Sequence, residues 1–154
     1  MFHPFALAVS KSESAADFQF LFKSLRTYDL EYQPTVLMAD GSDAITAGYE
    51  EVFGVPSRRL MRFIHVIKNV KPHLRGLTKG GICGKLRADT DALQICQDEA
   101  TFSKAVSLFL QKWKASPKSQ VREFADYFEE QWVCKYRYWF EGAAMKHPSP
   151  RMQC

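Results

Sequence analysis

The first 75 residues alternate short apolar runs with amphipathic segments, and this alternation limits the folds open to the chain. Residues 2–10 (FHPFALAVS) and 35–39 (TVLMA) have the length and apolar character of buried strands. Residues 58–64 (RRLMRFI) are a third strand candidate, although arginines interrupt their alternation. Strands that alternate with helices favour an α/β fold with parallel strands.

Two amphipathic helices are expected between these strands. Ser12 or Ser14 can cap the first, whose apolar residues share one face: Phe18, Leu21, Phe22 and Leu25. Ser42 can cap the second, which ends at Gly54. Its inner face holds Ile45, Tyr49, Val52 and Phe53. A short helix is also expected over residues 65–74, kinked or ended near Pro72.

The second half of the chain has a different character. Residues 76–88 (GLTKGGICGKLRA) contain four of the eight glycines, which predicts a flexible connection. Two helical faces rich in aromatic residues follow: Phe102, Ala105, Val106, Phe109 and Trp113, then Val121, Phe124, Phe128 and Trp132. These aromatic residues can form a core, which we prefer, or a surface that packs on a partner. We therefore expect two parts, 1–75 with the strands and 76–154 with helices.

The composition is that of a folded domain, since 46% of the 154 residues are hydrophobic and 25% are charged. No apolar run approaches the roughly 20 residues that span a bilayer. The N-terminus lacks the basic region and cleavage site of a signal peptide. The four cysteines show no C-x-x-C spacing, which indicates reduced thiols in an intracellular protein.

Basic residues concentrate in the middle of the chain. Nine Lys and Arg lie between Val52 and Ala88 with no Asp or Glu among them, although the whole chain has a net charge of only +4. Such a block attracts a phosphate backbone. The candidate nucleic-acid contacts are Arg58, Arg59, Arg62, Lys68, Lys71 and Arg75. A solvated basic face without a partner is the alternative interpretation.

Asp40 is the most conspicuous acidic residue, because it follows the apolar run of residues 36–38 and precedes Gly41. The carboxyl end of a strand is where α/β proteins bind ligands. Ser42 then begins a helix whose N-terminus favours anions. Asp40 is therefore a candidate Mg²⁺ ligand. Alternatively, Asp40 and Asp43 only begin and cap the helix.

The order of these segments resembles the catalytic domain of Mutator-like element (MULE) transposases. The resemblance rests on FHPFALAVS, VLMADGSDAITAGYEEVF, RFIHVIKNVKPHL and YFEEQWVCKYRYWFEGAAMKHPSP, and it is most specific over residues 35–70. It implies a partial ribonuclease H-like fold, with a parallel-stranded N-terminal half and a helical C-terminal half. It also implies DNA transposition, in which two aspartates and a glutamate hold two Mg²⁺ or Mn²⁺ ions for attack on a phosphodiester.

The resemblance assigns two catalytic candidates in this chain. Asp40 matches the second aspartate, which makes it a metal ligand, and His65 matches the histidine of a Cys-x-x-His pair. Arg62 stands where that pair has its cysteine. The first aspartate is expected before residue 2 and the glutamate after residues 148–150, so one acid of three remains to hold the metals.

We therefore expect a transposase fragment that is truncated at both ends, inactive by itself, and nuclear or otherwise intracellular. Glu129, Glu130 and Glu141 precede the expected glutamate position and do not match it. The expected partner is DNA, bound without sequence preference, and self-association is also open. The alternative is a non-catalytic module, derived from a transposase, that binds nucleic acid or another protein.

Overall fold

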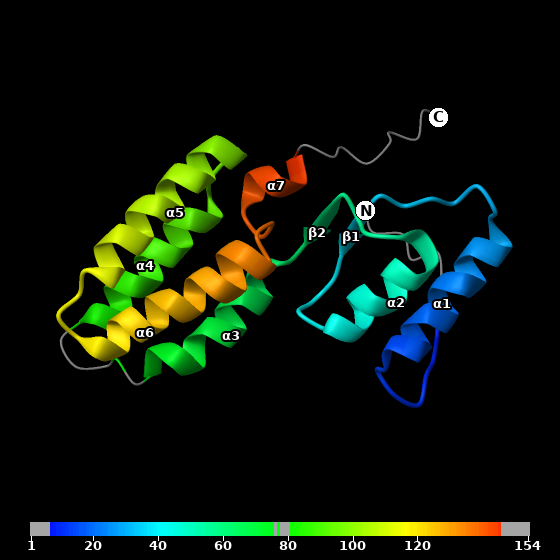
Figure 1. Ribbon diagram of the computed structural model, residues 1–154, viewed down its shortest axis with the longest axis horizontal. Coiled ribbons are helices and arrows are strands. Elements are labelled where there is room, and N and C mark those ends of the chain that lie inside the picture. The colour runs from blue at the N-terminus through cyan, green and yellow to red at the C-terminus, as the bar shows by residue number, and fades with distance from the viewer. Residues whose placement is uncertain (1–6, 76, 78–80, 146–154) are drawn as a thin grey trace. The chain divides into compact units, whose positions relative to one another are not determined.

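The chain divides into two compact units in a computed structural model, which describes residues 7–75, 77 and 81–145 (Figure 1). The first unit is Met1–Arg59 and the second is Leu60–Cys154. Our predicted boundary, between residues 75 and 76, lies one helix later. The difference arises because α3 (Phe63–Arg75) packs against the helices that follow it.

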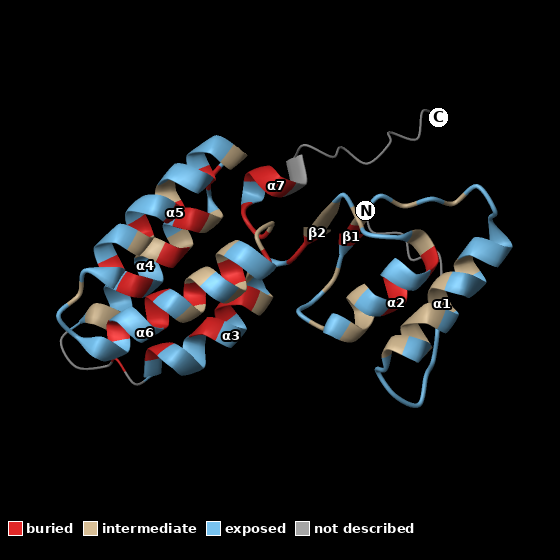
Figure 2. Cartoon of the chain, in the orientation of Figure 1, coloured by how far each residue is buried: buried red, intermediate tan, exposed pale blue. Residues whose placement is uncertain are grey.

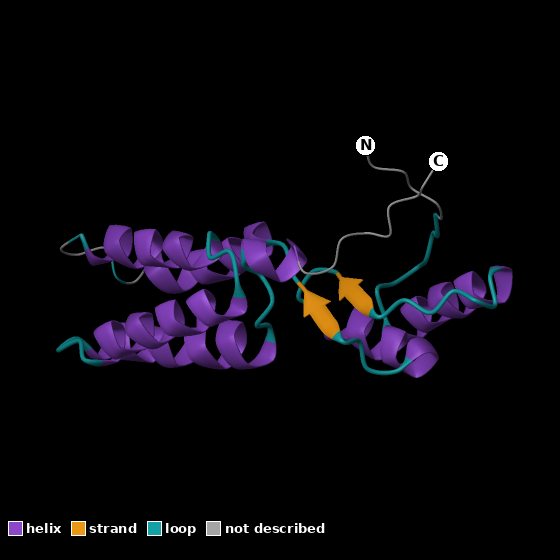
Figure 3. Cartoon of the chain, turned by 90° about the horizontal axis from the view of Figure 1, so that it is seen from above, coloured by secondary structure: helices purple, strands orange, loops and turns teal. Residues whose placement is uncertain are grey.

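The first unit is a small α/β arrangement. Its elements are α1 (Ala15–Tyr28), β1 (Val36–Met38), α2 (Asp43–Phe53) and β2 (Arg58–Leu60), the last of which reaches the unit boundary. The strands β1 and β2 pair in parallel, and α2 is the crossover between them (Figure 3). The predicted α/β class with parallel strands is thus confirmed for a sheet of two strands.

Capping and a close approach between backbones fix the two helices of the first unit. Ser14 caps α1 through a capping box, in which the Asp17 N–H donates to Ser14 Oγ at 3.3 Å and the Ser14 N–H donates to Asp17 Oδ2 at 3.1 Å. Gly48 of α2 faces α1, where a Cβ would lie 2.8 Å from the Ala15 carbonyl oxygen. Only glycine allows the two helices to pack this closely.

One strand prediction fails over its described residues, and another is confirmed only in part. Residues 7–10 form no strand, and Leu7 and Val9 are 93% and 95% exposed, while residues 2–6 lie outside the described residues. Residues 58–64 form a strand only as far as Leu60, because Phe63 and Ile64 begin α3. The arginines that interrupt the alternation mark the end of the strand.

The second unit is a bundle in which α3 contacts α4 and α6, and α5 contacts α4 and α6. A π-helix (η1) continues α6, and a short helix, α7, follows (Figure 1). The bounds are α4 (Ile82–Gln94), α5 (Glu99–Lys114), α6 (Ser119–Phe128), η1 (Glu129–Lys135) and α7 (Glu141–Met145).

Aromatic side chains fill the bundle, as we preferred. Both predicted helical faces are turned inward, and their buried positions lie on the facing sides of the helices (Figure 2). Trp139 is at the centre of this core, with its ring 5.3 Å from that of Phe102 and 6.0 Å from that of Phe128. Its indole N–H donates to the Trp132 carbonyl oxygen at 2.6 Å. The tryptophans therefore stabilise the bundle and do not form a partner surface.

The predicted connection over residues 76–88 is wrong for its second part, because α4 begins at Ile82. Leu86, Thr90 and Leu93 follow helical spacing and are buried. Their burial outweighs the cost of about 1 kcal/mol for a glycine at position 84 in a helix. Residues 76 and 78–80 lie outside the described residues. The helix expected over residues 65–74 is confirmed as α3, which begins two residues earlier and continues through Pro72 to Arg75.

Candidate nucleic-acid interface

Asp40 lies where the sequence predicts it, beyond the carboxyl end of β1, and it is exposed. Its Oδ1 accepts a hydrogen bond from the Ser42 N–H at 3.0 Å. Ser42 occupies the N-cap position of α2 but makes no capping hydrogen bond with its own side chain. The Asp40 carboxylate therefore already has a local role, since it shapes the turn that leads into α2.

The residues around Asp40 do not fit the two-metal site that the resemblance implies. Within residues 7–75, 77 and 81–145, no group of three or more His, Cys, Asp or Glu side chains could hold a metal ion. One oxygen of Asp40 is engaged by a backbone N–H. Two divalent ions need several carboxylates at fixed separations. Of the acids that the resemblance assigns to the metals, the described part of the chain contains Asp40 alone, and we assign no reaction step to a metal here.

Arg59 has a structural role that the sequence does not reveal. Its Nε donates to Thr46 Oγ1 at 3.0 Å, and its Nη1 donates to the Ala39 carbonyl oxygen at 3.0 Å. Its Nη2 donates to the Asp40 carbonyl oxygen. The guanidinium thus ties β2 to the end of β1 and to α2, and it is engaged by oxygens of its own unit. Arg58, its neighbour on β2, is only partly exposed.

His65 belongs to the second unit, whereas Asp40 belongs to the first. It lies in the first turn of α3 and is partly exposed. The backbone N–H of His65 donates to the Arg62 carbonyl oxygen at 3.0 Å, and the backbone carbonyl oxygen of His65 accepts from Asn69 Nδ2 at 2.8 Å. These contacts are made by its backbone, so they give the imidazole no catalytic partner.

The remaining predicted contacts gather on α3. Its inward face holds the buried side chains Val66, Ile67, Val70 and Leu74. Lys68, Lys71 and Arg75 recur at i, i+3 and i+7 and are all exposed. Arg62, just before the helix, is exposed as well. We call Lys68, Lys71 and Arg75 the basic face of α3.

The three cations on the basic face of α3 have no counter-ion among the described residues, in contrast to Arg87, Lys112, Lys114 and Arg137 of the same unit. Within the described residues, none of its three side chains forms an ion pair or a hydrogen bond. Elsewhere, Lys112 pairs with Asp89 at 2.6 Å, and Lys114 pairs with Asp126 at 3.0 Å. Hydrogen bonds from Lys114 to Glu129 and Asp126 raise the pKa of that lysine. Acidic partners therefore balance the charges of Lys112 and Lys114, whereas the charges on the basic face of α3 have no such partner.

Charge also segregates between the two units. Residues 60–154 contain sixteen Lys and Arg against nine Asp and Glu, a formal charge of +7. Residues 1–59 contain five against eight, a formal charge of −3. The second unit is therefore more basic than the net charge of +4 for the whole chain indicates. Such a charge favours association with polyanions.

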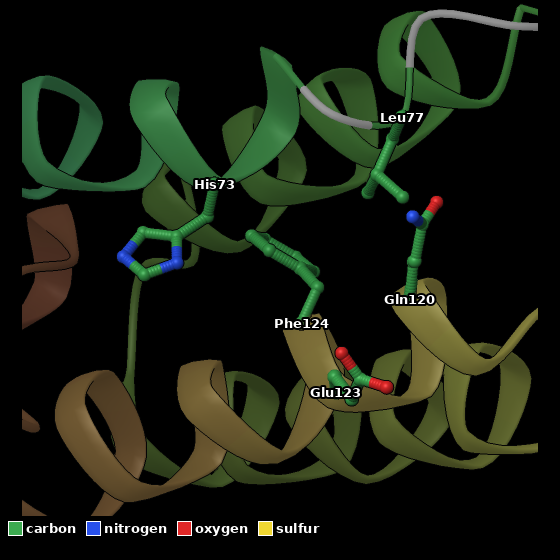
Figure 4. Close-up of a pocket in the computed structure, with 5 residues that line it drawn as sticks. All are labelled: His73, Leu77, Gln120, Glu123 and Phe124. Atoms are coloured by element: carbon green, nitrogen blue, oxygen red, sulfur yellow. The ribbon is translucent and has the colours of Figure 1, made fainter.

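A pocket of about 210 Å³ lies at the end of α3, where it meets the start of α6 (Figure 4). It is lined by His73, Leu77, Gln120, Glu123 and Phe124. The His73 ring stacks on the Tyr127 ring, with centroids 3.8 Å apart. Burial raises the pKa of Tyr127. One histidine and one glutamate are too few for a metal site, so this pocket adds no chemistry to the basic face.

Comparisons with known proteins add no family. The chain matches no protein-family model, and neither a curated protein nor a solved structure is significantly similar to it. Among the described residues, no helix combines the length and the apolar character needed to cross a membrane. The functional proposals therefore depend on the residues and their geometry.

Proposed function

We propose that the chain binds nucleic acid without sequence preference, through phosphate contacts made by the basic face of α3 and by Arg62. The observation that carries this proposal is the alignment of Lys68, Lys71 and Arg75 on one exposed helix face without acidic partners. Lysine and arginine side chains of this kind contact phosphates and release counter-ions, which favours binding but carries no base information. The charge of +7 in the same unit supports the assignment.

The proposal has a quantitative consequence. Four phosphate contacts predict that the logarithm of the binding constant falls with the logarithm of salt concentration with a slope of about −3.6. A fourfold rise in salt should then weaken binding roughly 150-fold. This dependence separates phosphate binding from a solvated basic face, which would show no binding to titrate.

Fluorescence anisotropy with two labelled duplexes of unrelated sequence tests the proposal. We expect both duplexes to bind with similar affinity at about 50 mM salt and to dissociate at about 200 mM, as counter-ion release requires. The absence of binding at low salt would overturn the proposal. Binding that is indifferent to salt, or restricted to one duplex, would do the same.

We also propose that the chain derives from a Mutator-like transposase and that its first unit is part of a ribonuclease H-like core. Two features support this origin: the parallel β1–α2–β2 unit and the position of Asp40 beyond the end of β1. If the proposal holds, DNA is the natural partner and the protein works in the nucleus. Mg²⁺ or Mn²⁺ then belongs to the intact family's site, which the described residues do not complete.

A strand-nicking assay tests whether the chain is catalytically active by itself. We expect the chain to leave a supercoiled plasmid intact in Mg²⁺ or Mn²⁺, because one carboxylate cannot offset two divalent ions. The matched control is Asp40→Ala, purified identically. Nicking by the wild type and not by the variant would show that the chain is an enzyme and that further ligands complete the site.

A further inference from the structure

A groove separates α3 from α4 in the second unit. It has a volume of about 240 Å³ and is lined by Ile67, Val70, Lys71, Leu74, Arg75, Cys83 and Arg87. Apolar residues of α3 line it together with Cys83 and three cationic residues. The sequence gives no hint of this groove, because residues 76–88 carry the glycine pattern of a connection, whereas α4 begins within them at Ile82.

The apolar lining of the groove is chemically selective. Its side chains from α3 are Ile67, Val70 and Leu74, which offer no hydrogen-bond donor or acceptor. A nucleobase placed here would lose hydrogen bonds to water at its polar edges without replacement, which is unfavourable. A hydrocarbon chain has no such groups, and its burial is favourable. The apolar side chains therefore favour an alkyl group over a base.

The cationic residues of the lining give the groove a net positive charge. Lys71 and Arg75 have no ion-pair partner within the described residues. Arg87, on the α4 side, donates to both carboxylate oxygens of Asp91, at 2.8 and 3.0 Å. The two α3 cations are therefore free to bind an anion, while the charge of Arg87 is already largely balanced.

The size of the groove argues for a small ligand. A stable protein interface involves about 20–30 residues on each side. Seven of the described residues line the groove, and the apolar ones from α3 cover two turns of that helix. A volume of about 240 Å³ is also below the usual range for drug-sized ligands. One alkyl chain fits these limits better than a protein surface does.

We propose that this groove binds a small amphipathic anion, an unbranched alkyl carboxylate, with its tail on Ile67, Val70 and Leu74 and its head group between Lys71 and Arg75. The site does not depend on the nucleic-acid proposal, but it uses two of the same cations. An occupied groove would neutralise part of the basic face of α3, so the carboxylate and nucleic acid compete.

Cys83 provides a direct readout of occupancy, because it lines the groove and is partly exposed. Cys134 is exposed on η1 and does not line the groove, so it serves as a control within the same chain. The probe is sodium dodecanoate below its micelle concentration, and the rate of N-ethylmaleimide addition to each thiol is followed by peptide mass spectrometry. At ten times the Kd, we expect addition at Cys83 to slow about tenfold. Addition at Cys134 should not change.

Two charge-reversal variants locate the head group. Lys71→Glu combined with Arg75→Glu should abolish the protection of Cys83, because the carboxylate then meets like charge in the lining of the groove. Lys68→Glu changes an exposed cation of the same helix that does not line the groove, so protection should persist. Circular dichroism confirms that each variant is folded. Lys68→Glu should still weaken DNA binding, which keeps the two proposals distinguishable.

Several results would overturn the groove proposal. One is that dodecanoate leaves Cys83 unprotected. Another is that it slows addition at Cys134 equally, which indicates a general effect on the protein. Protection by dodecyltrimethylammonium equal to that by dodecanoate would remove the role of the cations. Protection by an acidic leucine-containing peptide but not by dodecanoate would assign the groove to a protein partner instead.

Discussion

The variant Gly142→Ala tests the packing of the second unit. Gly142 is buried in α7, and its N–H donates to the Cys96 carbonyl oxygen at 2.9 Å. A Cβ at this position would lie 2.1 Å from the Gln97 carbonyl oxygen, whereas ordinary contact begins at 3.4 Å. The backbone at Gln97 would have to move by about 1.3 Å, close to the Asp98 cap of α5.

The expected cost has two parts. Overpacking against a rigid backbone costs about 1–3 kcal/mol, and loss of the hydrogen bond to Cys96 adds about 1 kcal/mol. We therefore expect Gly142→Ala to lower the free energy of unfolding by about 2–4 kcal/mol. The matched control is Gly84→Ala in α4, where a Cβ would meet nothing within 4 Å. It should stabilise the unit by about 1 kcal/mol through higher helix propensity.

Urea unfolding followed by tryptophan fluorescence measures both changes, since Trp113, Trp132 and Trp139 all lie in the second unit. With a denaturant dependence of about 2 kcal/mol per molar, the midpoint should fall by about 1–2 M for Gly142→Ala and rise by about 0.5 M for Gly84→Ala. A Gly142→Ala midpoint equal to that of the wild type would refute the close approach of α7 to the start of α5.

Two further predictions concern hydrogen bonds within each unit. Trp139→Phe leaves the buried Trp132 carbonyl oxygen without its donor, so we expect a loss of about 1–3 kcal/mol in urea unfolding followed by circular dichroism. Hydrogen bonds from Ser12 and Ser14 lower the pKa of Asp17 below its ordinary value of 3.8. Because this folded-state pKa is lowered, the stabilisation of α1 is present above about pH 4 and disappears as pH falls further. Ser14→Ala should weaken this acid transition, which thermal melts at stepped pH would show, and should cost about 1 kcal/mol at neutral pH.

Much of the local structure follows from the sequence. The apolar spacing of α1, α2, α5 and α6 predicts each helix, because one apolar face of each packs against a neighbour, and that of α1 is half-buried. The glycine that ends α2 is equally predictable, since Gly54 has φ +80°. The secondary structure of segments with a weaker sequence pattern is predicted incorrectly. Residues 7–10 are mostly apolar but form no strand, and α4 begins inside the glycine-rich stretch of residues 76–88 because Leu86 and Leu93 are buried.

The basic residues of the candidate site could be predicted from the sequence, but their arrangement in the fold could not. The basic block is continuous in the sequence, yet the fold separates its members. Arg59 is engaged by the Ala39 and Asp40 carbonyl oxygens, whereas Lys68, Lys71 and Arg75 share an exposed helix face. Sequence spacing alone could show the i, i+3, i+7 pattern on α3. It could not show which arginine would be needed to hold the first unit together.

The measurement that tests the central claim most directly compares the salt slopes of two triple variants with the wild type. One variant, Lys68→Gln/Lys71→Gln/Arg75→Gln, removes the basic face of α3. The other, Lys11→Gln/Lys23→Gln/Lys104→Gln, removes the same net charge from exposed positions elsewhere.

If the basic face of α3 contacts phosphates, its removal should reduce the slope for duplex DNA from about −3.6 to about −0.9, while the control keeps nearly the full slope. Equal slopes in the two variants would show that net charge alone attracts DNA, and would contradict a binding face on α3.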